Sequence, residues 1–163
     1  MTTTTKHETE IGADPKVPMI TIVREFDAEP EKVYRAWTDP ELVARWMGPK
    51  ALSMRIDEWD CRTGGSWRYT AVAEGETVAS FYGSFHEVRS DRIVQTFTYE
   101  GYPDGVALET MTFEDLGNGI TRLHGFSLCD SFEARDGMLA SGMEVGIHEG
   151  YAKLDDLLAE TAS

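Results

Sequence analysis

The chain has 163 residues, of which 41% are hydrophobic and 27% charged, and this composition fits one globular domain. Its 15 Lys and Arg residues against 29 Asp and Glu residues give a formal net charge of −14, which repels phosphate backbones and anionic lipid, so we expect no nucleic-acid or membrane partner. Cys61 and Cys129 lie far apart outside any CxxC spacing, which excludes a cysteine framework and makes the reducing cytoplasm the expected compartment.

Residues 1–17 are polar and show no periodicity, so we expect a disordered N-terminal tail followed by one domain over residues 18–160. From Met19 to Phe26, apolar and β-branched residues alternate in a way that is typical of a strand. The first strand is therefore predicted directly after the tail.

Two short helices are predicted next. Pro30 occupies a favourable first helical position, and Asp39 with Pro40 supplies both a stop and the start of a second helix, which ends at Gly48. Helices this short are expected to lie as a flap across one end of the fold.

The segment from Leu52 to Cys129 changes to period two. Clusters of turn-forming residues divide it into six strands, at 52–60, 66–73, 77–88, 92–100, 106–114 and 120–129. Because the connections are too short for a crossover helix, neighbouring strands are predicted to pair antiparallel.

The chain then turns helical. Asp130 to Glu133 has the form of a capping box, and a long C-terminal helix is predicted to start near Ser141, with one apolar stripe along its length. The prediction is thus an α+β fold, with a seven-stranded curved antiparallel sheet wrapped around that helix and two short helices between strands 1 and 2.

One helix cannot fill the concave side of so broad a sheet, so we expect a pocket between sheet and helix. Aromatic, methionine and isoleucine side chains are predicted to line it; they are Trp46, Trp67, Tyr69, Phe81, Phe97, Tyr99, Met111, Phe113, Met143, Ile147 and Tyr151. Plain core packing is the alternative for each of them.

Four residues are weak candidates for acid/base chemistry. Glu144 and His148 lie one turn apart on the predicted C-terminal helix, where a proton carrier and its orienting partner can meet, although a solvated contact is the alternative. His124 and His86 lie in strands and can point into the pocket or out to solvent. No HxH or HExxH motif is present, so no metal or other cofactor is expected.

Arginines and glycines give two further hypotheses. An inward-facing strand arginine can bind a planar anion or pair with a nearby acid; the candidates are Arg24, Arg55, Arg68 and Arg122. Gly142, Gly146 and Gly150 recur every four residues along the C-terminal helix, so they either leave room for a ligand or allow close packing on the short helices.

Several segments occur in a characteristic joint order: TIVREFDAEPEKV at 21–33, WTDPELVARWMGP at 37–49, GGSWR at 64–68, GSFHEV at 83–88, RIVQT at 92–96, GIT at 119–121 and LDDLL at 154–158. In these segments, and over about residues 19–160, the chain resembles the bacterial homologues of the activator of the heat-shock protein 90 ATPase, within the START-like (SRPBCC) helix-grip superfamily. The resemblance implies the helix-grip fold. It implies no single activity, because the superfamily includes carriers, aromatases and cyclases.

Three functions remain open. The first is binding of a hydrophobic or aromatic small molecule between the sheet and the C-terminal helix, with the segment 30–48 as a lid. The second is a cyclase- or aromatase-like enzyme that uses acid/base residues of the same cavity, and the sequence does not decide whether the protein is an enzyme. The third is an interaction module whose partner is a chaperone or a second copy of the chain.

Overall fold

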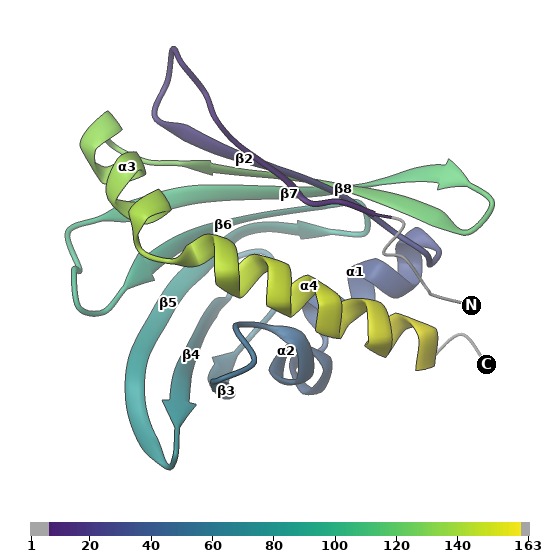
Figure 1. The fold of residues 1–163 in the computed structure, drawn as a ribbon, viewed down its shortest axis with the longest axis horizontal. Coiled ribbons are helices and arrows are strands. Elements are labelled where there is room, and N and C mark those ends of the chain that lie inside the picture. Colours follow the sequence, from purple (N-terminus) through teal and green to yellow (C-terminus); the bar gives the residue numbers. More distant parts are fainter. Residues whose placement is uncertain (1–6, 161–163) are drawn as a thin grey trace.

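An antiparallel sheet of eight strands curves around the C-terminal helix α4 (Met143–Glu160) in the computed structural model, which describes residues 7–160 (Figure 1). The strands are β1 (Glu10–Ala13), β2 (Met19–Phe26), β3 (Ser53–Trp59), β4 (Ser66–Ala73), β5 (Glu76–Arg89), β6 (Arg92–Tyr99), β7 (Val106–Gly117) and β8 (Ile120–Leu128). The other helices are α1 (Pro30–Thr38), α2 (Pro40–Trp46) and α3 (Phe132–Ala140). The predicted helix-grip fold is confirmed.

The strand order across the sheet is β1-β2-β8-β7-β6-β5-β4-β3, and every neighbouring pair is antiparallel. Strands β3 to β8 follow one another as a meander, as the short connections predicted. Strand β2 instead pairs with β8, and this pairing joins the start of the fold to the end of the meander.

The sheet has one strand more than the seven predicted. Residues Glu10–Ala13, which fall within the expected disordered tail, form β1 and pair with β2, where Ile11 lies opposite Ile22. The prediction is corrected for these four residues; residues 1–6 of the same tail lie outside the part of the chain that the structure describes. A run as short as Glu-Ile-Gly-Ala has too little alternation to reveal a strand, because its pairing depends on β2.

Helices α1 and α2 close one end of the fold. A proline starts each of them, and the Asp39 side chain accepts a hydrogen bond from the Glu41 amide at the start of α2. Two indoles hold their backbone: Trp46 Nε1 donates to the Ala36 carbonyl over 2.8 Å, and Trp59 Nε1 donates to the Thr38 carbonyl over 2.7 Å. The two helices are therefore a fixed end wall of the core.

The C-terminal helices begin and end at identifiable residues. Ser131 caps α3 by accepting a hydrogen bond from the Ala134 amide, which confirms the predicted helix start. Gly142 has a φ of +89° and separates α3 from α4, so α4 begins two residues after the predicted Ser141. Within residues 7–160, no helix has the length and apolar character that crossing a bilayer requires.

Glycines allow α4 to approach the segment that follows α2. A Cβ atom at Gly150 would lie 3.1 Å from the Trp46 carbonyl oxygen, and one at Gly146 would lie 3.5 Å from Pro49 Cδ. Gly142 lies outside the helix and has no such neighbour within 4 Å among the described residues. The structure thus favours close packing as the role of Gly146 and Gly150.

Candidate functional site

The concave side of the sheet is packed solid at the end covered by α1 and α2. The ring centroids of Trp37 and Trp46 are 4.6 Å apart, those of Trp37 and Phe113 are 5.6 Å apart, and those of Phe26 and Tyr151 are 5.4 Å apart. Trp46, Phe113 and Tyr151 were predicted to line a pocket, but all three are buried in this aromatic core. The expectation of an interior that its side chains cannot fill is therefore wrong for this end.

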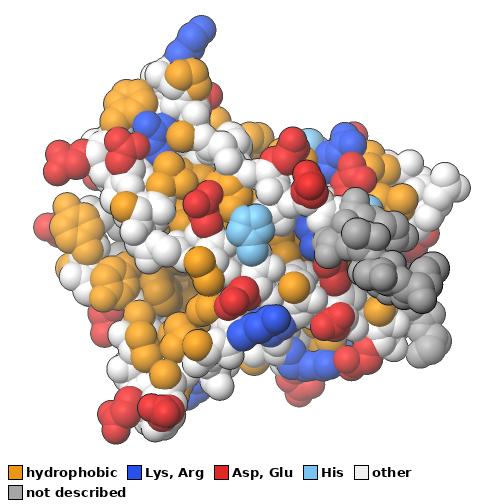
Figure 2. Space-filling view, in the orientation of Figure 1, with side chains coloured by type: hydrophobic (Ala, Val, Ile, Leu, Met, Phe, Trp, Pro, Cys, Tyr) orange, Lys and Arg blue, Asp and Glu red, His pale blue; other side chains and the backbone are white. Residues whose placement is uncertain are grey.

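At the other end of the concave side, several aromatic side chains stay partly exposed. Strands β4, β5 and β6 carry an aromatic surface there that faces α4, and we call it the aromatic shelf; its residues are Tyr69, Phe81, Phe97 and Tyr99. Phe81 and Phe97 are only partly buried, and Tyr99 is 44% exposed. Figure 2 shows hydrophobic side chains gathered over β4 and β5, beside the first half of α4.

Period two and strand register assemble the aromatic shelf. Tyr69 of β4 lies opposite Phe81 of β5, and Phe81 lies opposite Tyr99 of β6, so three strands contribute one row of rings. Adjacent centroids in this row are 5.6 Å apart, and Phe97 lies 5.4 Å from Phe81. The rings support one another in tilted contacts, as aromatic pairs prefer.

Trp67 is buried next to the aromatic shelf and does not form part of its surface, since it is only 1% exposed. Its ring stacks on Tyr69 at 5.0 Å and lies 5.8 Å from Phe97. Gly83 of β5 makes this possible, since a Cβ atom there would lie 2.7 Å from Trp67 Nε1 and 1.9 Å from the Thr96 carbonyl oxygen. The predicted lining residue Trp67 is therefore a support of the site.

Three further predicted lining residues belong to β7 and α4, and Met111 lies opposite Ile93, four positions along β6 from Phe97. Met111 of β7 and Ile147 of α4 pack against the core cluster and remain partly buried, and Met143 at the start of α4 is also partly buried. Side chains of this kind adapt to the shape of an apolar neighbour. Together they place apolar groups on both the sheet and the helix side.

One acidic residue faces the concave side next to the aromatic shelf. Glu109 of β7 accepts a hydrogen bond from Gln95 Nε2 over 3.1 Å and another from Ser127 Oγ over 2.8 Å. Burial raises the pKa of the Glu109 carboxyl, although the two hydrogen bonds act in the opposite direction. Burial raises the pKa of the Tyr69 and Tyr151 phenols, and the charge of Glu109 raises it further. Both hydroxyls are therefore near this carboxyl.

Glu109 is not among the site residues predicted from the sequence. A signal for it was present, because Glu109 alternates in phase with Ala107, Met111 and Phe113, all of which face the concave side. An acid at an inward position of an otherwise apolar strand face is unusual enough to be singled out.

The predicted acid/base residues do not come together. Glu144 and His148 are both exposed, and the structure of residues 7–160 shows no hydrogen bond between them. His124 Nε2 lies 3.0 Å from Glu114 Oε1 on the outer face of the sheet, and His86 is exposed. The acid/base site predicted at Glu144, His148 and His124 is not supported by this arrangement.

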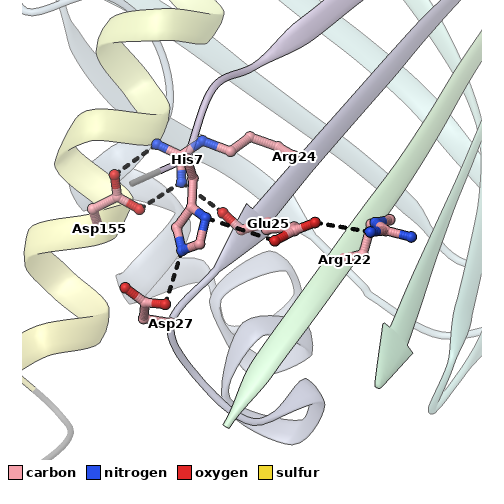
Figure 3. Close-up of polar contacts among 6 residues, drawn as sticks. All are labelled: His7, Arg24, Glu25, Asp27, Arg122 and Asp155. Carbon is pink, nitrogen blue, oxygen red and sulfur yellow. Dashed lines mark hydrogen bonds and ion pairs between the residues drawn. The ribbon is translucent and has the colours of Figure 1, made fainter. Parts of the chain in front are cut away.

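The strand arginines pair with acids, as the second of the two hypotheses for them expected. Arg24 is 4% exposed and donates to both carboxylate oxygens of Asp155 on α4, over 2.8 and 2.6 Å. Figure 3 shows this pair beside two neighbouring ones, His7 with Asp27 at 2.8 Å and Arg122 with Glu25 at 2.9 Å. Arg55 pairs with Asp57, and Arg68 pairs with Glu100.

A separate recess lies on the outer face of the sheet. Its volume is about 460 Å³, and hydroxyl groups with one arginine form much of its lining, among them Ser66, Ser84, Thr96, Thr98 and Arg68. These residues alternate with those that face α4, so the recess is on the side opposite the aromatic shelf. Its polar lining does not match the apolar site that the sequence predicted.

Comparison with known proteins identifies relatives of the whole domain. A family model described as Activator of Hsp90 ATPase homolog 1-like protein matches residues 27–159. A solved protein from Rhodobacter sphaeroides is 27% identical and superposes with a TM-score of 0.84, covering 94% of this chain and 99% of that one. One from Arthrobacter aurescens is also 27% identical, with a TM-score of 0.83 and coverage of 94% and 93%. Comparison with curated proteins gives no match.

Proposed function

Because the chain belongs to the family of Activator of Hsp90 ATPase homolog 1-like proteins, with its START-like helix-grip fold, we propose that it binds a hydrophobic or aromatic small molecule on the aromatic shelf. The ligand lies between strands β4 to β6 and the first half of α4.

The proposal rests on aromatic side chains that face the helix side of the sheet and that the helix covers only in part: Tyr69 is 9% exposed, but the other three rings of the aromatic shelf keep contact with solvent. Tyr99 is 44% exposed, and Phe81 and Phe97 are partly buried. Burying an aromatic side chain fully contributes about 1.5–3 kcal/mol, so a concave row of partly uncovered rings is a favourable surface for an apolar ligand. Small-molecule sites combine such apolar walls with a few polar groups.

The packed end of the core strengthens the argument. Trp46 and Tyr151 fill the space under α2 and the second half of α4, so the fold is able to fill its interior where stability alone is served. At the aromatic shelf the same fold leaves rings partly uncovered while Met143 and Ile147 of α4 stay partly buried. This contrast favours a binding surface at that end over a loosely packed core.

The test is titration with a neutral fluorescent apolar probe, N-phenyl-1-naphthylamine. We expect saturable binding that Phe97→Ala weakens at least tenfold, because the substitution removes a ring from the centre of the aromatic shelf. Phe126→Ala is the matched control, since Phe126 is 39% exposed on the outer face and its loss is expected to leave probe binding unchanged. Absence of saturable binding, or equal weakening by both variants, would overturn the proposal; thermal melting confirms that each variant is folded.

A second candidate function is docking of a partner protein on the outer face of the sheet. Strands β7 and β8 expose contiguous apolar side chains there: Val106, Leu108, Phe126 and Leu128, which are 39–47% exposed. The net charge of −14 disfavours a second copy of the chain and favours a partner with a basic rim. We propose a chaperone of the Hsp90 class as the partner.

Stimulation of the ATPase of a purified bacterial Hsp90 tests this second candidate. Wild type is expected to stimulate it and Leu108→Glu is not, because the substitution places a charge at the centre of the apolar patch. Lack of stimulation by wild type, or equal stimulation by the variant, contradicts the docking function and leaves the small-molecule proposal untouched.

A further inference from the structure

Glu109 lies within reach of a ligand on the aromatic shelf. Phe97 of β6 is opposite Ala107 of β7, and Gln95 is opposite Glu109, so Phe97 and Glu109 are diagonal neighbours on one face of the sheet. Such neighbours are typically about 7–8 Å apart, which is within the span of a small aromatic molecule with a short side chain.

The carboxylate of Glu109 has only neutral partners among residues 7–160. The Gln95 amide and the Ser127 hydroxyl each donate one hydrogen bond to it. A carboxylate offers about four acceptor positions, so two remain for another donor. Although burial raises the pKa of its carboxyl, the Glu109 residue keeps some exposure to solvent.

The cations that might have paired with Glu109 are engaged elsewhere. Arg24, the buried arginine of the concave side, is held by both oxygens of Asp155. The charge of Glu109 raises the pKa of the Tyr69 and Tyr151 phenols and of the Cys129 thiol, and none of these three groups is a cation. Arg135, which lies near Cys129, donates to Asp136 and to the Asp14 carbonyl. An acid placed among apolar side chains with no positive partner is costly unless something else supplies one.

We propose that the ligand of the aromatic shelf carries a protonated amine, which pairs with Glu109 while its apolar part covers Phe81 and Phe97. This inference rests on the proposed small-molecule function. Two properties of the protein support it beyond the pairing itself. The net charge of −14 raises the local concentration of cations, and the faces of aromatic rings attract an ammonium group.

The experiment compares two probes of the same shape, 2-(naphthalen-2-yl)ethylamine and 2-(naphthalen-2-yl)ethanol, by calorimetric titration. Wild type is expected to bind the amine at least tenfold more tightly than the alcohol. Glu109→Gln is expected to remove this preference while leaving the affinity for the alcohol unchanged. Phe97→Ala is expected to weaken both.

Glu114→Gln is the matched control. It makes the same change in net charge on the same strand, but Glu114 lies on the outer face with His124, so the preference for the amine is expected to persist. Equal affinities of wild type for both probes, or loss of the preference in both glutamate variants, would overturn the amine inference and leave the small-molecule function standing. If neither probe binds wild type, both proposals fail.

Discussion

Alanine substitutions at the helical glycines test how closely α4 approaches the end wall formed by α1 and α2. Alanine is favoured over glycine in a helix by about 0.5–1 kcal/mol, so each substitution starts from a gain of that size. At Gly146 a Cβ atom would meet only Pro49 among the described residues, with Cδ at the ordinary contact distance of 3.5 Å and the backbone nitrogen at 4.0 Å. We therefore expect Gly146→Ala to increase the free energy of unfolding by about 0.5–1 kcal/mol.

Gly150 is different because its neighbours are backbone atoms. A Cβ atom there would lie 3.1 Å from the Trp46 carbonyl oxygen and 3.5 Å from two backbone atoms of Gly48. The hydrogen bond from the Trp46 indole to Ala36 restrains this segment, so it cannot easily withdraw. Overpacking of this kind costs about 1–3 kcal/mol, and we expect Gly150→Ala to lower the free energy of unfolding by about 1 kcal/mol.

Urea unfolding followed by tryptophan fluorescence measures these differences, and thermal melting checks them, with about 2–4 °C expected per kcal/mol for a domain of this size. Gly137→Ala in α3 is the control, because no described atom outside its immediate neighbours lies within 4 Å of its Cβ position and the full helix gain is expected. The reasoning is refuted if Gly150→Ala stabilises the protein as much as the other two.

Four further substitutions have expected outcomes in unfolding measurements. Asp155→Asn is expected to cost about 3 kcal/mol, because it removes the negative charge that neutralises the buried Arg24 guanidinium and leaves Arg24 with the Glu25 carbonyl as acceptor. Arg24→Met is expected to cost less, since Asp155 is 34% exposed and can be hydrated; equal costs would contradict this. Burial raises the pKa of Glu109, so the stability that its protonated form contributes below the unfolded value of about 4.3 is lost as pH rises through the folded pKa. Glu109→Gln is therefore expected to gain stability relative to wild type as pH rises above about 4.3, and a difference that stays constant with pH would argue against burial as the cause. Gly83→Ala places a Cβ atom 1.9 Å from the Thr96 carbonyl oxygen and is expected to destabilise the protein by more than about 3 kcal/mol. If this variant melts at the same temperature as wild type, β5 and β6 are able to move apart locally and the expectation is wrong.

Much of the fold could be predicted because its signals are local. The prolines at 30 and 40 start α1 and α2, Ser131 caps α3, and alternation marks the strands of the meander. Strand β1 could not be predicted, since Ile11 has a strand partner only through the tertiary pairing with β2. Its four residues carry no period of their own.

The site was predictable only in part. Phe81, Phe97 and Tyr99 follow from strand period and register, and Glu109 would have followed from the same phase. Which end of the concave side is filled depends on how α1 and α2 pack, and no local pattern contains that information.

The rotation of α4 has a similar origin. Glu144 and His148 have the spacing that an acid/base pair requires, but contacts of Gly146 and Gly150 with the segment after α2 help set which side of the helix meets solvent. Sequence periodicity defines the stripe of a helix, and tertiary packing decides how that stripe is oriented.

The pairing of β2 with β8 makes one step in assembly of the sheet much slower than the others. Glu25 and Arg122, which meet across this pair, are 97 positions apart in the chain, whereas the meander strands are joined by short turns. Closing a loop of that length costs about 3 kcal/mol more in chain entropy than closing a four-residue turn. The hairpins of β3 to β8 are therefore expected to form before β2 joins them. Until then, the edge of β8 that later pairs with β2 is free to pair with strands of other molecules. The yield of refolding is therefore expected to fall as the protein concentration rises.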